Sequence, residues 1–299
     1  MMMKPKCRCT TGNRMASLTA LLLSAVCGLA SNGYGEDSEK SGDPKDQFAL
    51  GVAYLEGKGV KKDPEQAGFW FRKSADQGNP RAWNALGSLY CNGLGTTQDY
   101  AKARECFEKA AAMEEPKAFY NLGMMEEKGW GSGADSVKAI GFYERSEKAG
   151  YAKAALKLGE IYYYGDCGQP KDYQKARDHF LAASGMGDPA ADNFLGSMAE
   201  HGQGGAVSGK EAMKFYRRSA EGGDRLARAN LGRIYLNGDC GEKKDEFKAI
   251  EWLCFAEAAG NGNATTMMDE YSQTLDPALL KSAKASAKKK LVEGARSPE

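Results

Sequence analysis

The residue types that perform covalent catalysis are sparse in this sequence of 299 residues. Serine enzymes of the β-lactamase type need Ser-x-x-Lys together with Ser-Asp-Asn and Lys-Thr-Gly. The segment Ser286-Ala287-Lys288-Lys289 fits the first motif, but the sequence contains neither of the other two. The match lies in a lysine-rich segment near the C-terminus, where chance explains it. We therefore expect no acyl-enzyme chemistry and assign no catalytic residue.

A second segment has the spacing of a phosphate-binding loop. Gly204 to Lys210 matches Gly-x-x-x-x-Gly-Lys, but such a loop also needs a preceding strand and a Ser or Thr after the lysine to hold Mg²⁺. Glu211 follows instead, and a helical pattern precedes. We interpret the segment as a long turn between two helices, and the other Gly-x-Gly turns as helix ends. No cofactor is expected.

The sequence offers few residues that could form a metal site or a nucleic-acid site. The sequence has only two histidines, His179 and His201, and neither has a carboxylate or cysteine at ligand spacing. The formal net charge is +1, so no overall positive field favours nucleic acid. We expect no metal site and no nucleic-acid partner.

The chain is organised instead by a recurring Leu-Gly pair. Successive leucines are separated by 36, 36, 36, 37 and 36 residues, obtained by subtracting their positions. Near-constant spacing of this kind is typical of a repeat array. The pairs are Leu50-Gly51, Leu86-Gly87, Leu122-Gly123, Leu158-Gly159, Leu195-Gly196 and Leu231-Gly232.

The second unit shows that each repeat can form a pair of helices. In this unit, Pro80 suits a helix start, Leu86 and Tyr90 share an apolar face, and Gly93 suits the helix end. Asp99 then suits the cap of a second helix. One such pair cannot bury its own apolar face, but stacked pairs can. We therefore predict an all-α fold, a right-handed α-solenoid of about six antiparallel helix pairs over residues 43–275.

These residues resemble the Sel1-like repeat family, a subclass of the tetratricopeptide-type helical repeats. The shared pattern is Ala-x-x-x-Leu-Gly-x-x-Tyr, a Gly-x-Gly turn, an Asp, and Ala-x-x-aromatic-aromatic-x-x-Ala-Ala, in six in-register copies. The 36-residue period is closer to this family than to the 34 residues of plain tetratricopeptide repeats. The resemblance implies a non-catalytic adaptor or scaffold that binds other proteins.

The resemblance also implies where a partner binds. In tetratricopeptide-type arrays the first helix of each pair lines the concave face, so we expect the positions two and five residues on either side of each repeated leucine to form a peptide groove. Some of these side chains could instead pack between repeats. The candidates are Arg81, Asn84, Ser88, Lys117, Tyr120, Met124, Lys153, Leu156, Glu160, Tyr163, Asn193 and Arg233, together with Phe48, Val52 and Leu55.

The N-terminal segment reads as a targeting signal. A basic stretch precedes the apolar run 16–30, and Gly28-Leu29-Ala30 provides small residues for cleavage after Ala30. We predict a signal peptide over residues 1–30 and a flexible linker over residues 31–42. The protein is then exported to the periplasm or secreted, with no membrane span left after cleavage. An uncleaved membrane anchor is the alternative.

Five cysteines follow the predicted signal peptide, and an export route permits disulfides. Cys91 and Cys106 lie in one repeat, and Cys240 and Cys254 lie in another with a similar separation. Both pairs are candidate disulfides, and free thiols are an equal alternative for each. Some exported relatives of this type are described as β-lactamase-like or penicillin-binding, but those carry a paired cysteine in every repeat.

Residues 276–299 are predicted to form a C-terminal capping helix with a basic tail. Asp276-Pro277 suits a helix start, and the lysines that follow form a solvated face. Contact with an acidic polymer or lipid headgroups is the alternative. The sequence as a whole predicts an adaptor that binds a protein or peptide of unknown identity. The alternatives are a cell-envelope enzyme and a passive structural element.

Overall fold

The computed structural model describes residues 42–295, 297 and 298, and the predicted signal peptide and the predicted linker up to residue 41 lie outside this part. Within the described residues the chain forms 14 helices and no strand. The helices are α2 (Pro44–Glu56), α3 (Pro64–Asp76), α4 (Pro80–Asn92), α5 (Tyr100–Ala112), α6 (Pro116–Lys128), α7 (Ser136–Lys148), α8 (Ala152–Tyr164), α9 (Tyr173–Gly185), α10 (Pro189–His201), α11 (Gly209–Glu221), α12 (Arg225–Asn237), α13 (Glu246–Ala258), α14 (Gly262–Ser272) and α15 (Pro277–Val292).

The ends of the helices follow the local sequence. α4 begins at Pro80, after Asn79, whose side chain accepts a hydrogen bond from the Arg81 N–H. It ends at Gly93, which has the left-handed φ of 64° that favours glycine. α5 is capped by Asp99, which accepts from the Lys102 N–H. The predicted start, stop and cap are confirmed.

The Leu-Gly pair is the point of closest approach within each unit. A Cβ atom on the glycine would lie 2.5–2.8 Å from a side chain of the second helix, which is too short for a real contact. Five units place an aromatic ring there, and the sixth places Leu253. The pairs are Gly51 with Phe71, Gly87 with Phe107, Gly123 with Tyr143, Gly159 with Phe180, Gly196 with Tyr216, and Gly232 with Leu253.

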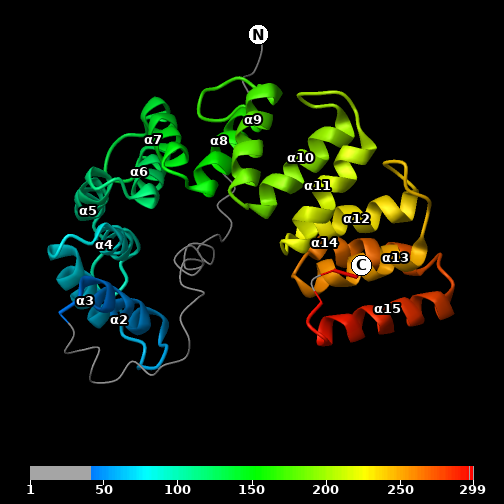
Figure 1. Cartoon of the computed structure of the whole chain (residues 1–299), viewed down its shortest axis with the longest axis horizontal. Helices are drawn as coiled ribbons and strands as arrows, with labels where there is room; N and C mark the ends of the chain where they lie inside the picture. Colours follow the sequence, from blue (N-terminus) through cyan, green and yellow to red (C-terminus); the bar gives the residue numbers. More distant parts are fainter. Residues whose placement is uncertain (1–41, 296, 299) are drawn as a thin grey trace, which may run out of the picture.

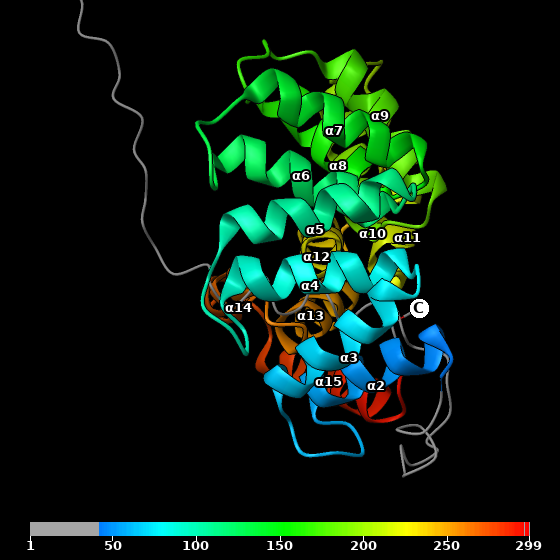
Figure 2. The same ribbon diagram turned by 90° about the vertical axis from the view of Figure 1, so that its left-hand side faces the viewer.

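The units stack into an open arch (Figure 1), in whose left half α2, α4 and α6 lie on the inner side and α3, α5 and α7 on the outer side. We call the first helix of each unit the inner helix and the second the outer helix. Each outer helix packs against the inner helix of its own unit and that of the next unit. Figure 2 shows helices α2 to α7 as successive, roughly parallel layers. The predicted all-α solenoid is confirmed, and its core lies between the two layers of helices.

The array closes with α14 and α15. α15 packs against α13, where Ala283 and Ala287 are fully buried and Ser286 and Lys290 both donate to Glu251. A capping helix at this position was predicted. One detail of the sequence interpretation was wrong: the connection from α10 to α11, residues 202–208, is as long as residues 57–63 of the first unit and is therefore not a longer turn.

Candidate functional site

A cavity of about 340 Å³ lies on the inner side of the first three units. Nine of the fifteen predicted groove residues line it: Phe48, Val52, Leu55, Arg81, Asn84, Ser88, Lys117, Tyr120 and Met124. We call this cavity the inner groove. Its remaining walls are Glu56, Phe71, Ala85, Asn92, Glu115, Pro116, Asn121, Gly150 and Tyr151.

The other six predicted residues do not line the inner groove. Tyr163 donates to Gln203 and packs against Phe194, and Asn193 accepts from Asn230. Arg233 pairs with Glu200. These three side chains make contacts between repeats, which was the alternative that the sequence left open. The half-buried side chains of Lys153, Leu156 and Glu160 lie on α8, beyond the cavity.

Nine of the lining residues were not among the sequence candidates, and two of them, Glu115 and Tyr151, share one position in the repeat. Glu115 and Tyr151 immediately precede α6 and α8, so they lie outside the register counted from the repeated leucines. Both occupy the helix N-cap position without making a side-chain cap, although the equivalent Asp43 and Asn79 do cap their helices. The absence of a capping residue type at these two positions is the signal that could have found them.

Aromatic rings give the groove its apolar surface. Phe48 and Phe71 lie 5.4 Å apart, and the Tyr120 ring lies 5.3 Å from that of Tyr151, measured between centroids. Burial raises the pKa of the Tyr120 hydroxyl above its ordinary value, and raises that of Tyr151 to about 12. Among the described residues neither hydroxyl has a hydrogen-bond partner, so both can bond to a ligand.

Asn84 supplies a fixed polar group in the groove wall. The residue is only 6% exposed, and its amide oxygen accepts from the Asn121 Nδ2 at 2.8 Å. Its own Nδ2 finds no acceptor within the described part of the chain. A buried amide that keeps a free donor beside a cavity is suited to bind a backbone carbonyl.

Four cations follow one another at the N-terminal ends of the inner helices, and two of them, Arg81 and Lys117, line the inner groove. Lys45, Arg81, Lys117 and Lys153 are each the second residue of an inner helix, at a spacing of 36 residues. We call this row the basic ladder. None of the four side chains has an ion-pair partner in residues 42–295. The pKa of Lys117 lies below its ordinary value because of burial, and Arg81 and Lys153 lower it further while Glu115 opposes them.

The position of the basic ladder is unfavourable for the helices themselves. A positive charge in the first turn opposes the helix dipole, at a cost of about 0.3–1 kcal/mol for each cation. No intramolecular ion pair offsets that cost. Four successive violations of a local rule in one row indicate a role other than folding.

Carboxylates lie at the opposite ends of the inner helices. Glu127 accepts from the Tyr143 hydroxyl at 2.8 Å and from Lys157, and two units further on Glu200 accepts from Tyr216 and Arg233 in the same way. The half-buried Glu160 has no bonding partner in the described chain, and burial raises its pKa above the ordinary value. Glu127 and Glu200 near the ends of α6 and α10 are therefore paired with cations, whereas the cations of the basic ladder are not paired among the described residues.

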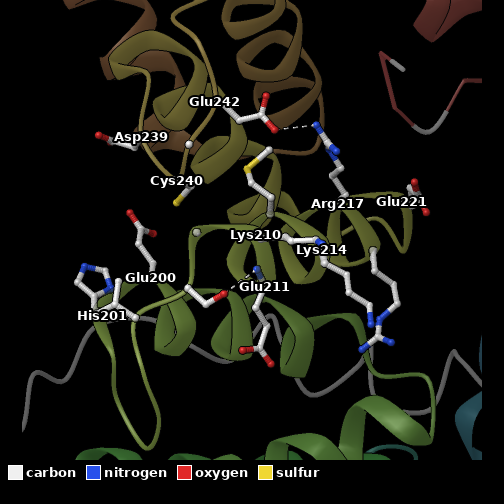
Figure 3. A pocket seen from close by; sticks show the side chains of 16 residues that line it. Glu200, His201, Lys210, Glu211, Lys214, Arg217, Glu221, Asp239, Cys240 and Glu242 are labelled. Carbon is white, nitrogen blue, oxygen red and sulfur yellow. Dashed lines mark hydrogen bonds and ion pairs between the residues drawn. The ribbon is translucent and has the colours of Figure 1, made fainter.

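A larger hollow of about 1540 Å³ opens beside α11 (Figure 3). Its walls are mostly charged and include no aromatic side chain. Arg217 pairs with Glu242 at 3.3 Å across it, and Glu200 is held by Arg233. This open hollow has two lysines that are unpaired among the described residues, Lys210 and Lys214, but lacks the apolar rings that the inner groove places beside its donors, and the inner groove is therefore the candidate site.

The catalytic motifs considered from the sequence have structural partners. The Ser286 hydroxyl donates to Glu251 at 2.6 Å, and Lys210 belongs to α11 after a turn rather than to a strand-derived loop. His179 pairs with Glu147 and stacks on Tyr162. No cluster of three metal-ligating side chains occurs within the described residues.

The candidate disulfides are not formed in the structure. Cys91, Cys106, Cys240 and Cys254 are all free thiols. Burial raises the pKa of Cys91, Cys106 and Cys254 to about 11, so these three remain protonated at neutral pH. They behave as small apolar side chains in the core.

Comparison with known families agrees with this architecture. The family model described as Sel1 repeat matches six successive segments, residues 44–79, 80–114, 116–151, 152–188, 189–224 and 225–261. The chain belongs to the Sel1 repeat family. The matched segments coincide with the six helix pairs from α2 to α13. A comparison with curated protein sequences gave no significant match.

Solved structures similar to this chain include another Sel1 repeat protein. One from Oxalobacter formigenes is 32% identical, with a TM-score of 0.69, and the alignment covers 76% of this chain and 91% of that one. A protective antigen from uropathogenic Escherichia coli is 25% identical, with a TM-score of 0.48 and coverage of 83% and 60%. An immunity protein from Pseudomonas aeruginosa is 20% identical, with a TM-score of 0.49 and coverage of 74% and 81%.

The family and the fold together indicate the class of partner. Sel1 repeat proteins mediate protein–protein interaction. Among the described residues no helix has the length and apolar character needed to cross a membrane.

Proposed function

We propose that this Sel1 repeat protein is a non-catalytic adaptor that holds an extended segment of a partner protein in the inner groove. The observation that supports the proposal most directly is the grouping of unpartnered donors with apolar rings in one cavity. Tyr120, Tyr151 and Asn84 present hydrogen-bonding groups beside Phe48, within a wall made by three repeats. Peptide recognition needs this combination of apolar pockets and fixed polar groups.

The shape of the groove favours a peptide over a compact ligand. The cavity crosses α2, α4 and α6, so an occupant must run along the stack of repeats. Extended chain rises about 3.3 Å per residue and can follow such a path with alternate side chains inward. The signal-peptide pattern of residues 1–30 leads us to propose that the encounter takes place in the periplasm or outside the cell.

Site-specific photo-crosslinking tests the adaptor proposal. A benzophenone amino acid is placed at Tyr120 in the groove and, as the matched control, at Leu181, an exposed residue of the outer helix α9. Extract from the source organism is added and the adducts are identified by mass spectrometry. We expect a protein adduct from position 120 that is absent from position 181. Equal adducts from both positions, or none from position 120, would contradict the proposal.

A groove variant provides the second test. Tyr120→Ala with Lys117→Glu removes one ring and reverses one charge of the inner groove. Recovery of the crosslinked partner in a pull-down should then fall by about tenfold or more, because central aromatic and basic anchors carry most of the binding energy in such interfaces. Unchanged recovery with this variant would show that the partner binds elsewhere.

A further inference from the structure

The cations of the basic ladder do not stabilise the helices that carry them. We therefore look for their role in the binding of a ligand. Reversing the sense of these charges would favour the inner helices, since acidic residues are preferred in the first turn. The cations are nevertheless present in four successive units, and among the described residues none of them is paired. The fifth and sixth units have Ala190 and Leu226 at the same position, so the ladder stops there.

The spacing of the ladder sets the spacing of its ligand. Successive inner helices touch through their side chains, as Asn84 and Asn121 do across α4 and α6, so their axes lie roughly 10 Å apart. Because each cation is the second residue of its helix, we take the same interval of roughly 10 Å for the ladder. In a polyproline II helix three residues rise about 9 Å and bring every third side chain onto one face. Carboxylates at every third position of such a segment therefore lie opposite successive cations of the basic ladder.

We propose that the basic ladder binds an extended acidic segment of the partner protein, with carboxylates at every third residue. The charge complementarity lies between these carboxylates and Lys45, Arg81, Lys117 and Lys153, while the rings of the inner groove accept intervening side chains. The inference rests on the proposed adaptor function and specifies the chemistry of its ligand.

Several carboxylates lie near the ladder or in the inner groove. Glu56 lines the groove but pairs with Lys58 at 2.6 Å. Glu115 opposes Lys117 alone, and Asp43 is engaged in capping α2. Asp46 follows Lys45 in the first turn of α2, and Glu114 precedes Glu115, so the four cations stand out because they are unpaired among the described residues, not because the surrounding charge is in excess.

A peptide with fixed spacing is the direct probe. Fluorescein-labelled (Glu-Pro-Pro)4 places its carboxylates at the ladder interval, and a control peptide of the same composition groups its glutamates at one end. Binding to the full chain is followed by fluorescence anisotropy at low ionic strength. We expect the regular peptide to bind about threefold or more tightly than the grouped one, and added salt to weaken it. Equal affinity for the two peptides would overturn the proposal.

Charge reversal separates the ladder from general electrostatics. Arg81→Glu with Lys117→Glu should weaken the regular peptide by about tenfold or more, whereas Lys210→Glu with Lys214→Glu on α11 makes the same change of net charge and should alter affinity by less than about twofold. The ladder variant should melt at the same temperature as the native chain or higher, because its glutamates suit the first helical turn. Loss of peptide binding without loss of stability therefore identifies binding residues.

Three further outcomes would contradict either the acidic-segment inference or the adaptor function. If single-stranded (dT)12 binds more tightly than the regular peptide, the ladder recognises phosphate and the proposal is wrong. If the Tyr120 photo-crosslink to a partner persists in the ladder variant with unchanged yield, the adaptor function stands and the acidic-segment inference fails. If no partner crosslinks at position 120 in the native chain, the adaptor function itself fails.

Discussion

At the scale of single residues, the repeats show a paired exchange of tyrosine and glutamate. The third and fifth units have a glutamate at the end of the inner helix and a tyrosine on the outer helix, joined by a hydrogen bond of 2.8 Å. The other four units have Phe71, Phe107, Phe180 or Leu253 at the tyrosine position and no glutamate opposite. The hydroxyl is therefore present only where a half-buried carboxylate needs a donor.

Tyr143→Phe tests this pairing. The change keeps the ring that packs on Gly123 but removes the donor to Glu127, so the free energy of unfolding should fall by about 1–2 kcal/mol. Chemical denaturation measures it. Tyr173→Phe is the control, because the Tyr173 hydroxyl has no partner in the described chain, and it should cost less than about 0.5 kcal/mol. Similar losses in both variants would mean that the hydroxyl bond contributes little.

Glu160 gives the protein a dependence on pH. Its pKa is raised in the folded state, mainly by burial, so the folded protein binds that proton more tightly than the unfolded chain. The ionised carboxylate therefore lowers stability at neutral pH, and this loss disappears as the pH falls below the raised pKa. Glu160→Gln should be more stable than the native chain at pH 7 and equal to it at about pH 4.

Denaturant midpoints at the two pH values measure the effect. Glu144→Gln on α7 removes an exposed carboxylate and serves as the control, with a change below about 0.5 kcal/mol at either pH. The same gain for Glu160→Gln at both pH values would show that its charge is not the cause.

At the scale of the helix pair, the Leu-Gly motif is a packing joint. Gly159→Ala would place a Cβ 2.5 Å from the Phe180 ring and should cost about 1–3 kcal/mol of unfolding free energy through overpacking. Gly141→Ala on α7 is the matched control, because a Cβ there meets nothing within 4 Å. This second change should stabilise the protein by up to about 1 kcal/mol, since alanine favours the helix.

Thermal melting of both variants measures the opposed shifts. A destabilised Gly141→Ala, or an unchanged Gly159→Ala, would show that helix propensity rather than close approach determines the presence of these glycines.

The sequence was most informative at this scale, because a repeated pattern fixes each helix and its register. Pro80, Gly93 and Asp99 determine local structure by their own chemistry, so the helix ends could be predicted from them. The same register located Arg81, Lys117 and Tyr120 in the inner groove. It failed for Arg233 because a side chain's partner depends on the neighbouring unit, here Glu200, which no single repeat specifies. Glu115 and Tyr151 were missed because they precede the inner helices.

At the scale of the whole molecule, contacts run only between neighbours in the stack. The described helices pack within a unit, against the next unit, or, at the end of the array, α15 against α13. In such a one-dimensional arrangement stability is approximately a sum of unit and interface terms. The net charge of +1 sums 41 basic and 40 acidic residues and carries no information on the row of four equivalent cations. The row becomes visible only when the fold places equivalent positions of successive inner helices side by side.

Removing α15 should therefore loosen one end of the array and leave the other unchanged. Deletion of residues 276–299 exposes the core side chains that Ala283 and Ala287 cover, and removes Ser286 and Lys290 from the buried Glu251. Hydrogen exchange in α13 should accelerate by about tenfold or more, which corresponds to a loss of about 1.4 kcal/mol of local stability. Exchange in α4 to α7 should match that of the full chain.

Adding Glu251→Gln to the deletion should recover part of the protection in α13, because the unpaired carboxylate is then absent. Uniform acceleration from α4 to α13 would instead show that the solenoid unfolds as one cooperative unit, and the nearest-neighbour description would not hold.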